Sequence, residues 1–249
     1  MGEVHFSVED HIALIVLDNQ KKRNAVDPPM REGLEKAYEK IIKDDDIRVA
    51  VITGAGDKAF SSGGDIDAYA DKGVFGPGAE PLPPIPRPWP IWKPFIAAIN
   101  GYAVGGGFAL ALACDLRVVG RSSTIGLSGL RRGAVQGAQQ SQRLTRLIGM
   151  SKALELLLLS KYVGGEEAAE IGLAQAVVDD DQVLAHAMGW ATTIASYSPW
   201  AVQKTKELAY QGFNMPLDEA FAWESEVTLE GYQRDDALEG FTGFLKNKK

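Results

Sequence analysis

The stretch from Pro94 to Cys114 carries no charged residue and is as long as a membrane-spanning helix. It also contains Asn100 and four glycines, Gly101 and Gly105 to Gly107. These residues would leave a lipid-facing helix badly packed, so we interpret the stretch as a buried strand, a turn and a buried helix. A chain that contains such a segment has to build a layered core around it.

Short apolar runs and amphipathic segments alternate around this stretch. Residues 4–18 predict a β-hairpin, and residues 28–43 carry apolar side chains at helical spacing after Asp27-Pro28. The runs at 48–54, 95–99 and 116–120 predict buried strands. The alternation of strands with helices predicts an α/β layered core.

From residue 182 onward the pattern is almost wholly helical, with breaks at Ser198-Pro199 and near residues 214–216. We therefore predict two regions: an α/β core at 1–195 and a C-terminal helical oligomerisation region at 196–249. The apolar residues of the second region need a surface in the same chain or in a neighbouring subunit. They include Phe221, Trp223, Val227, Leu238, Phe241 and Phe244.

The charge and cysteine counts exclude several classes of protein. Lys and Arg number 26 against 33 Asp and Glu, which gives a net charge of −7 and argues against nonspecific binding to nucleic acid. One cysteine and three histidines predict neither a disulfide framework nor a Cys/His zinc site, so no metal is expected. Charges at Glu3, Glu9 and Asp10 interrupt any signal-like run, and we expect a cytoplasmic protein without membrane contact.

Several motifs resemble catalytic signatures without matching them. Gly54, Gly56 and Ala59 have the spacing of a dinucleotide fingerprint, but FSSGGD follows them instead of a helix. The GLSGL motif around Ser128 has Leu130 where a nucleophile elbow needs glycine. We expect structural or solvated roles for the remaining candidate nucleophiles and bases, which are His5, His11, His186 and Cys114.

The segment from Pro77 to Pro94 holds eight of the twelve prolines and cannot be a regular helix. Two interpretations stay open. One is a surface loop, and the other is a lid over a ligand site with Trp89 and Trp92 facing the ligand.

Two glycine-rich turns, KAFSSGGDI at 58–66 and NGYAVGGGFALALACD at 100–115, each follow a predicted strand. Backbone N–H groups in such turns can donate to a carbonyl oxygen and stabilise an oxyanion. The glycines can equally serve only to let one turn pack closely on the other. The spacing alone does not choose between these functions.

The two turns strongly resemble the crotonase superfamily, that is, the enoyl-CoA hydratases and isomerases. Matching stretches occur in family order over nearly the whole chain: LDNQKKRNAV, VAVITGAGDKAFSSGGDI, KPFIAAINGYAVGGGFALALACDLRVV, SQRLTRLIG, EEAAEIGLAQAVV and DDALEGFTGFLKNKK. The resemblance implies a spiral of ββα units followed by a helical trimerisation region. It also implies a homotrimer or a dimer of trimers.

The resemblance assigns the two oxyanion donors to the backbone N–H groups of Gly64 and Gly106, which would hold the thioester carbonyl of an acyl-CoA. Coenzyme A enters as part of the substrate, and no tightly bound cofactor is implied. The residues implied to contact it are Lys22, Arg23, Ala25, Ala59, Ser62, Gly64, Asp65, Ile66 and, from another subunit, Phe241. For Asp65 and Asp67 a salt bridge or a helix cap is the simpler role.

The chain departs from the family at both catalytic glutamates, because Ala109 and Gly129 stand at those positions. A third position that carries an acid in other branches is Gly137. Neither a methyl group nor a hydrogen transfers protons, so ordinary hydration by the usual mechanism is doubtful. The nearby polar residues are expected to lie mostly on a solvated loop and helix face: Ser128, Arg131, Arg132, Gln136, Gln139 and Gln140.

The first functional hypothesis is an enoyl-CoA hydratase/isomerase-type enzyme that stabilises an enolate-like intermediate. Within it, isomerisation, decarboxylation and C–C bond hydrolysis with a non-standard proton-transfer group stay open. The second hypothesis is a noncatalytic acyl-CoA binding protein on the same fold. The Pro- and Trp-rich segment also suggests an aromatic or otherwise bulky acyl group.

Overall fold

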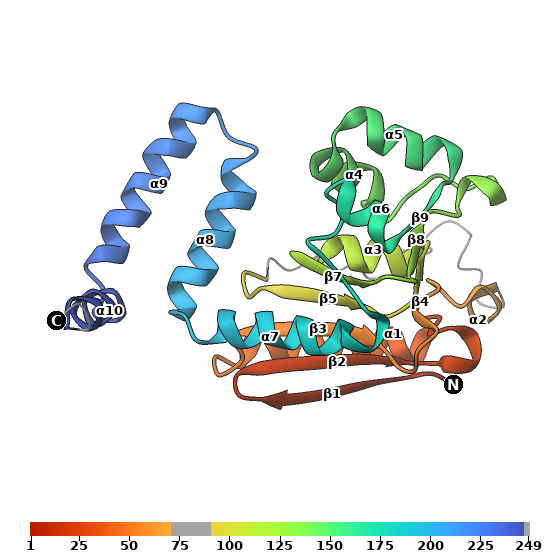
Figure 1. Cartoon of the computed structure of the whole chain (residues 1–249), viewed down its shortest axis with the longest axis horizontal. Helices are drawn as coiled ribbons and strands as arrows, with labels where there is room; N and C mark the ends of the chain where they lie inside the picture. The colour runs from red at the N-terminus through yellow and green to blue at the C-terminus, as the bar shows by residue number, and fades with distance from the viewer. Residues whose placement is uncertain (71–90, 247–249) are drawn as a thin grey trace.

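The computed structural model describes residues 1–70 and 91–246. Its main feature is a six-stranded sheet in the order β1-β2-β3-β5-β7-β10 (Figure 1). The first two strands form the predicted antiparallel hairpin, and the other neighbours are parallel. The strands are β1 Glu3–Glu9, β2 Ile12–Asp18, β3 Val49–Gly54, β5 Phe95–Ile99, β7 Leu116–Gly120 and β10 Ala176–Val178.

A second sheet has the order β4-β6-β8-β9, with bounds β4 Ala59–Ser61, β6 Tyr102–Val104, β8 Thr124–Gly126 and β9 Tyr162–Gly164. The strands β3, β5 and β7 of the large sheet are each followed by a strand of the small sheet and then by a helix. These helices are α2 Ile66–Ala70, α3 Gly106–Ala113 and α4 Gln140–Ile148. The expected spiral of ββα units is therefore confirmed.

Two layers of helices cover the large sheet. The helix α1, Pro28–Lys43, begins where the side chain of Asp27 accepts a hydrogen bond from the N–H of Met30 at 3.1 Å. It packs with α3 on one face, while α7, Val183–Ala195, packs on the other. Alternation along β3 sends Ala50 and Ile52 to the first face and Val49 and Val51 to the second. The remaining helices of this part are η1 Gln20–Lys22, η2 Leu130–Arg132, α5 Met150–Leu159, α6 Gly165–Glu170 and η3 Asp180–Gln182.

The uncharged stretch from Pro94 to Cys114 forms β5, β6 and α3, which confirms the interpretation as strand, turn and helix. Asn100 fastens its turn to the end of β3: its Nδ2 donates to the carbonyls of Gly54 and Gly56, both at 2.7 Å. Among the described residues, no helix is long and apolar enough to cross a membrane.

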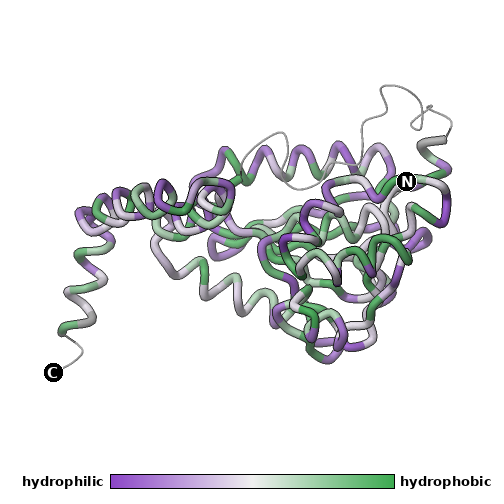
Figure 2. Tube along the Cα trace, turned by 90° about the horizontal axis from the view of Figure 1, so that it is seen from above, coloured by the Kyte–Doolittle hydropathy of each residue, from purple (hydrophilic) through white to green (hydrophobic). Residues whose placement is uncertain are grey.

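The chain ends in a C-terminal arm of three helices, α8 Pro199–Gly212, α9 Leu217–Tyr232 and α10 Asp235–Lys246. Both predicted helix breaks, at Ser198-Pro199 and near 214–216, are confirmed. The arm extends away from the sheets (Figures 1 and 2). It is fastened near its start, where Lys206 donates to Asp115 at 2.7 Å and the hydroxyl of Tyr210 donates to the same carboxylate at 3.0 Å.

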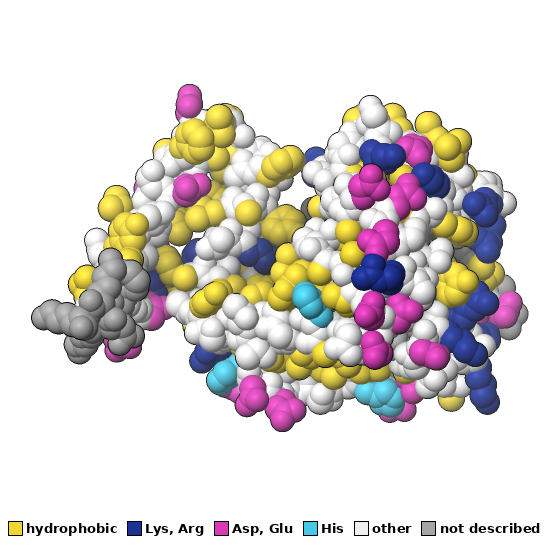
Figure 3. Space-filling view, in the orientation of Figure 1, with side chains coloured by type: hydrophobic (Ala, Val, Ile, Leu, Met, Phe, Trp, Pro, Cys, Tyr) yellow, Lys and Arg dark blue, Asp and Glu magenta, His cyan; other side chains and the backbone are white. Residues whose placement is uncertain are grey.

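Many large apolar side chains of the arm are exposed, and Figure 3 shows hydrophobic side chains gathered over α8 and α9. Exposed fractions exceed half for Phe213, Leu217, Phe221, Leu229, Tyr232, Leu238, Phe241 and Leu245.

Candidate active site

The two glycine-rich turns lie against each other, because they follow the neighbouring parallel strands β4 and β6. Gly63 has φ +97°, and a Cβ built on it would lie 2.8 Å from the backbone nitrogen of Gly106. A Cβ on Gly107 would overlap the carbonyl of Ser61. The pairing of β4 with β6 shifts register between Ala59 and Ser61, as at a β-bulge, just before the first turn. The packing is thus compatible with both functions proposed for the glycines, oxyanion binding and close approach of the turns. Of the two, the contacts directly require close approach.

The backbone of the first turn is bonded on both sides of Gly64. The N–H groups of Ser62 and Asp65 donate to the carbonyls of Arg23 and Val26 at 2.9 and 3.0 Å. The N–H of Gly63 donates to Ser61 Oγ at 3.2 Å. Within the part of the chain that the structure describes, the N–H of Gly64 has no acceptor. Among these residues it is a backbone donor that its bonded neighbours hold in place and that has no partner.

The second turn leads directly into α3, whose first residue is Gly106. First-turn N–H groups of a helix have no partner inside the helix, and none of the described residues supplies an acceptor for Gly106. The helix is apolar and buried from Gly107 to Ala113. A helix N-terminus in such low-dielectric surroundings favours negative charge on a ligand oxygen.

Asp65 follows Gly64 and is 5% exposed. Its carboxylate accepts two hydrogen bonds from the Lys22 ammonium, at 2.9 and 2.7 Å, and one from the N–H of Ala68 at 3.3 Å. Burial would raise the pKa of Asp65, but the Lys22 ammonium and the backbone N–H groups outweigh it and lower this pKa. The carboxylate is therefore an ionised anchor for the turn, as the sequence suggested.

Five of the residues implied to contact coenzyme A lie in or beside the first turn. Ser62 Oγ donates to the carbonyl of Lys22 at 3.0 Å, and the Arg23 guanidinium lies 4.9 Å from the ring centroid of Tyr102. Ile66 is half exposed. Ala25 and Ala59 are buried, so they support the turn from inside the protein.

Phe241 is not brought to this turn within one chain. It lies on α10 and contacts Tyr232, with 6.0 Å between the ring centroids. Figure 1 places α10 at the far end of the arm, opposite α2. Contact between Phe241 and a Gly64 turn would therefore require a second subunit.

The two positions to which the resemblance assigns catalytic glutamates differ in their surroundings. Ala109 is buried in α3, where its N–H donates to the carbonyl of Gly105 at 3.0 Å. Gly129 donates its N–H to Gln136 Oε1 at 3.1 Å, and a Cβ on Gly129 would meet that oxygen at 2.8 Å and the carbonyl of Ala134 at 3.0 Å. The amide of Gln136 therefore occupies the space into which a side chain at position 129 would grow.

The expectation of a solvated loop and helix face is wrong for two of the six polar residues. Gln136 and Gln140 are 7% and 5% exposed, whereas Arg131 and Arg132 are exposed as predicted. Gln140 lies four residues before the buried Leu144 on α4. This i, i+4 spacing puts it on the apolar stripe of the helix, and it was the signal in the sequence that could have predicted its burial.

The segment between Asp115 and Glu155 contains no Asp or Glu. The polar side chains that it places near the turns are hydroxyl, amide and guanidinium groups. Ser128 Oγ, for example, lies 3.2 Å from where a Cβ on Gly105 would stand. None of these groups is a base at neutral pH, so this segment offers no obvious proton acceptor near the turns.

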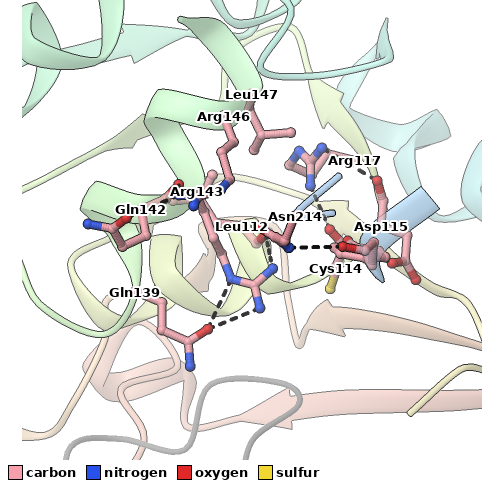
Figure 4. Close-up of a pocket in the computed structure, with 11 residues that line it drawn as sticks. Leu112, Cys114, Asp115, Arg117, Gln139, Gln142, Arg143, Arg146, Leu147 and Asn214 are labelled. Atoms are coloured by element: carbon pink, nitrogen blue, oxygen red, sulfur yellow. Dashed lines mark hydrogen bonds between the residues drawn. The ribbon is translucent and has the colours of Figure 1, made fainter. Parts of the chain in front are cut away.

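Two cavities, of about 380 and 530 Å³, lie at the other end of α3, about 12 Å along the helix from Gly106. Figure 4 shows Arg143 turned toward Gln139, with Cys114 and Asp115 at the end of α3. Cys114 is buried as predicted, and burial raises the pKa of its thiol to about 12, so the thiol stays protonated at neutral pH. Trp92 lines the larger of the two cavities, whereas Trp89 and most of the proposed lid lie outside the described residues.

The other motifs and residues for which we expected no catalytic function lie in surroundings that fit a structural or solvated role. The strand β4 follows Gly54 and Gly56, so no helix N-terminus stands behind them. His5 and His11 are half exposed and contact Asp18 and Asp46. In the described ranges, no three His, Cys, Asp or Glu side chains gather as a metal would need.

Comparisons with known proteins agree with the fold and the paired glycine-rich turns described above. A family model described as enoyl-CoA hydratase/isomerase matches residues 7–249. The chain is 36% identical to (E)-benzylidenesuccinyl-CoA hydratase of Thauera aromatica, over 97% of this chain and 95% of that protein. It is 31% identical to 2,3-dehydroadipyl-CoA hydratase of Escherichia coli K12, over 100% of this chain and 97% of that protein.

The fold is similar to that of solved hydratases. The crystal structure of enoyl-CoA hydratase from Mycobacterium tuberculosis H37Rv superposes with a TM-score of 0.91 and 33% identity, covering 98% of this chain and 96% of that one. Sequence, fold and the paired glycine turns lead to one assignment. The chain belongs to the enoyl-CoA hydratase/isomerase family of the crotonase superfamily.

Proposed function

We propose that the chain binds an acyl-CoA thioester with its carbonyl oxygen between the N–H groups of Gly64 and Gly106, and stabilises an enolate-like intermediate there. The observation that carries the proposal is the pair of abutting turns, each with a backbone donor that has no acceptor in the described residues. Each donor contributes roughly 3 kcal/mol to the transition state when it is aimed at a developing oxyanion. Coenzyme A is part of the substrate, and the proposal needs no metal or bound cofactor.

The reaction that we propose is an enolate-forming step rather than hydration by two glutamates. Ala109 and Gly129 offer no carboxylate, and Asp65 is held by Lys22. A water, a polar side chain or a carboxylate of the substrate itself would then move the proton. The relative from Thauera aromatica is named for a benzylidenesuccinyl group, which supports an aromatic acyl group for this chain.

We further propose that the working form is a homotrimer or a dimer of trimers in the cytoplasm. The exposed apolar residues of the arm support it, and so does the separation of Phe241 from the turn of its own chain. In the assembly the arm would cover a neighbouring subunit, and Phe241 would reach the coenzyme A of that subunit.

Gly63→Ala tests the oxyanion hole, because the added methyl group would press on the nitrogen of Gly106. Gly172→Ala is the matched control: Gly172 has φ +77°, so its backbone is comparably strained by alanine, but a Cβ there meets nothing within 4 Å. Turnover would be measured on a panel of saturated and 2-unsaturated acyl-CoAs, with aliphatic and aromatic members. We expect Gly63→Ala to lower kcat on the order of 10²-fold relative to Gly172→Ala.

Equal kcat in the two variants would contradict the oxyanion hole. Tight binding of several acyl-CoAs by the wild type without turnover of any would show a noncatalytic binding protein instead. Equal affinity for aliphatic and aromatic members would remove the aromatic preference.

A further inference from the structure

Gln140 reaches from the start of α4 to the second glycine-rich turn. Its Nε2 donates to the carbonyl oxygen of Gly105 at 2.9 Å, and the N–H of Ala109 donates to the same oxygen at 3.0 Å. The carbonyl of Gly105 and the N–H of Gly106 belong to one peptide group. Because that group is planar and trans, its C=O and N–H point in opposite directions, and a donor that fixes the oxygen also fixes the N–H.

A hydrogen bond to the carbonyl also polarises the peptide group. Chains of hydrogen bonds strengthen one another in low-dielectric surroundings, so donation to the Gly105 oxygen makes the Gly106 N–H a stronger donor. The side chain of Gln140 is 5% exposed, and α3 beside it is apolar. Water therefore screens this polarisation little.

Two features show that placing the Gln140 amide at this position costs free energy. Gln140 Oε1 is buried and has no hydrogen-bond partner among the described residues, which is unfavourable for a polar atom removed from water. The two preceding residues, Ala138 and Gln139, have φ of 51° and 64°, a left-handed conformation that is unfavourable for residues other than glycine. Strain of this kind persists only where the surrounding contacts enforce it.

We propose that Gln140 is a positioning residue for the oxyanion hole: its amide holds and polarises the Gly105–Gly106 peptide group, whose N–H binds the thioester oxygen. The inference rests on the proposed function. It gives α4 a part in carbonyl polarisation in a chain that has Ala109 and Gly129 in place of the two carboxylates.

The test uses cinnamoyl-CoA, whose conjugated thioester absorbs at longer wavelength when its carbonyl oxygen accepts strong hydrogen bonds. Gln140→Met keeps the length of the side chain and removes the donor. Gln142→Met is the matched control, because Gln142 lies exposed on the same helix and bonds Arg146 instead. We expect Gln140→Met to bind the probe within about threefold of the wild type, to lose most of the red shift and to lower kcat roughly tenfold. Gln142→Met should keep both the red shift and the kcat of the wild type.

Gln140→Glu adds a pH readout that a merely structural role would not give. A carboxylate cannot donate to the Gly105 oxygen, but a protonated carboxyl group can. We expect the red shift of this variant to be small at neutral pH and to return as the pH falls, with no such change in the wild type. Because pH alone switches the donor on, this comparison also serves if Gln140→Met folds poorly.

A full red shift in Gln140→Met and a pH-independent one in Gln140→Glu would overturn the inference and leave the oxyanion hole standing. Binding of cinnamoyl-CoA by the wild type without any red shift would overturn the proposed oxyanion hole and the role of Gln140 with it.

Discussion

At the scale of single residues, the space beside Gly129 decides whether the site accepts a side chain there. Gly129 has φ −61° and ψ −48°, which any residue adopts, so its backbone does not require glycine. The obstacle is the amide of Gln136, which bonds the N–H of Gly129 on one side and Ser160 Oγ on the other at 3.0 Å. At the position where the resemblance places a family glutamate, this chain therefore has a glycine whose side-chain space holds the Gln136 amide.

Gly129→Ala therefore measures the contact with Gln136. We expect it to lower the free energy of unfolding by about 1–3 kcal/mol, because the methyl group overpacks a closed site. In a Gln136→Ala background the added cost should fall by at least about half, since the amide oxygen is gone while the carbonyl of Ala134 remains. Urea unfolding of the wild type, the two single variants and the double variant completes this double-mutant cycle. Additive effects would show that the amide is not the obstacle.

The sequence predicts what depends on long or periodic patterns and misses what depends on single contacts. The apolar runs of β3, β5 and β7, the cap at Asp27 and the breaks in the arm could all be predicted. The strands of the small sheet have three residues each, too few for a hydrophobic period, and two of them, β4 and β6, lie inside the glycine-rich turns. The resemblance proposes Gly64 and Gly106 as donors. The burial of Gln140 could have been predicted from its i, i+4 spacing to Leu144, whereas that of Gln136 depends on single contacts with Gly129 and Ser160.

At the scale of elements, the contact between η1 and the start of α2 is electrostatic and should respond to pH. The pKa of Asp65 is lowered in the folded state, so its ionised form stabilises the fold above its ordinary value of 3.8, and that stability is lost as the pH falls through the lowered pKa. The Lys22 ammonium that holds it is partly exposed, which limits the contribution of the pair.

Asp65→Asn should cost about 1 kcal/mol of unfolding free energy at neutral pH and should flatten the decline of stability below about pH 4. Asp67→Asn is the control, since Asp67 lies 3.6 Å from the same ammonium but its side chain is 89% exposed. Chemical denaturation from neutral to acidic pH provides the measurement. Parallel pH profiles for the wild type and Asp65→Asn would contradict the assignment.

At the scale of the whole molecule, the arm presents more apolar surface than the described part of its own chain covers. Phe221 and Leu229 lie eight residues apart on α9, on the same side of the helix, and are 56% and 62% exposed. Burial of both against another subunit would make them central to the assembly. We expect Phe221→Asp/Leu229→Asp to weaken self-association by more than about 10²-fold and to lower turnover as well, because Phe241 would no longer reach a neighbour.

Sedimentation across a range of protein concentrations measures this effect, with Glu226→Lys/Glu230→Lys as the control on exposed positions of the same helix. A wild type that stays monomeric at all concentrations would contradict the trimer, as would an unchanged assembly of the aspartate variant.

The parallel pairing of β4 with β6 imposes an order in time on the growing protein. Ala59 pairs with Tyr102, so the first turn leaves the ribosome well before its partner strand exists. A parallel pair closes only across a long intervening loop, whose closure entropy makes the step slow. Until then the edge of β4 stays open to other strands. Under the proposed function, a nascent chain would gain the capacity to hold a thioester only after α3 has emerged, and every shorter chain would carry one of the two proposed donors.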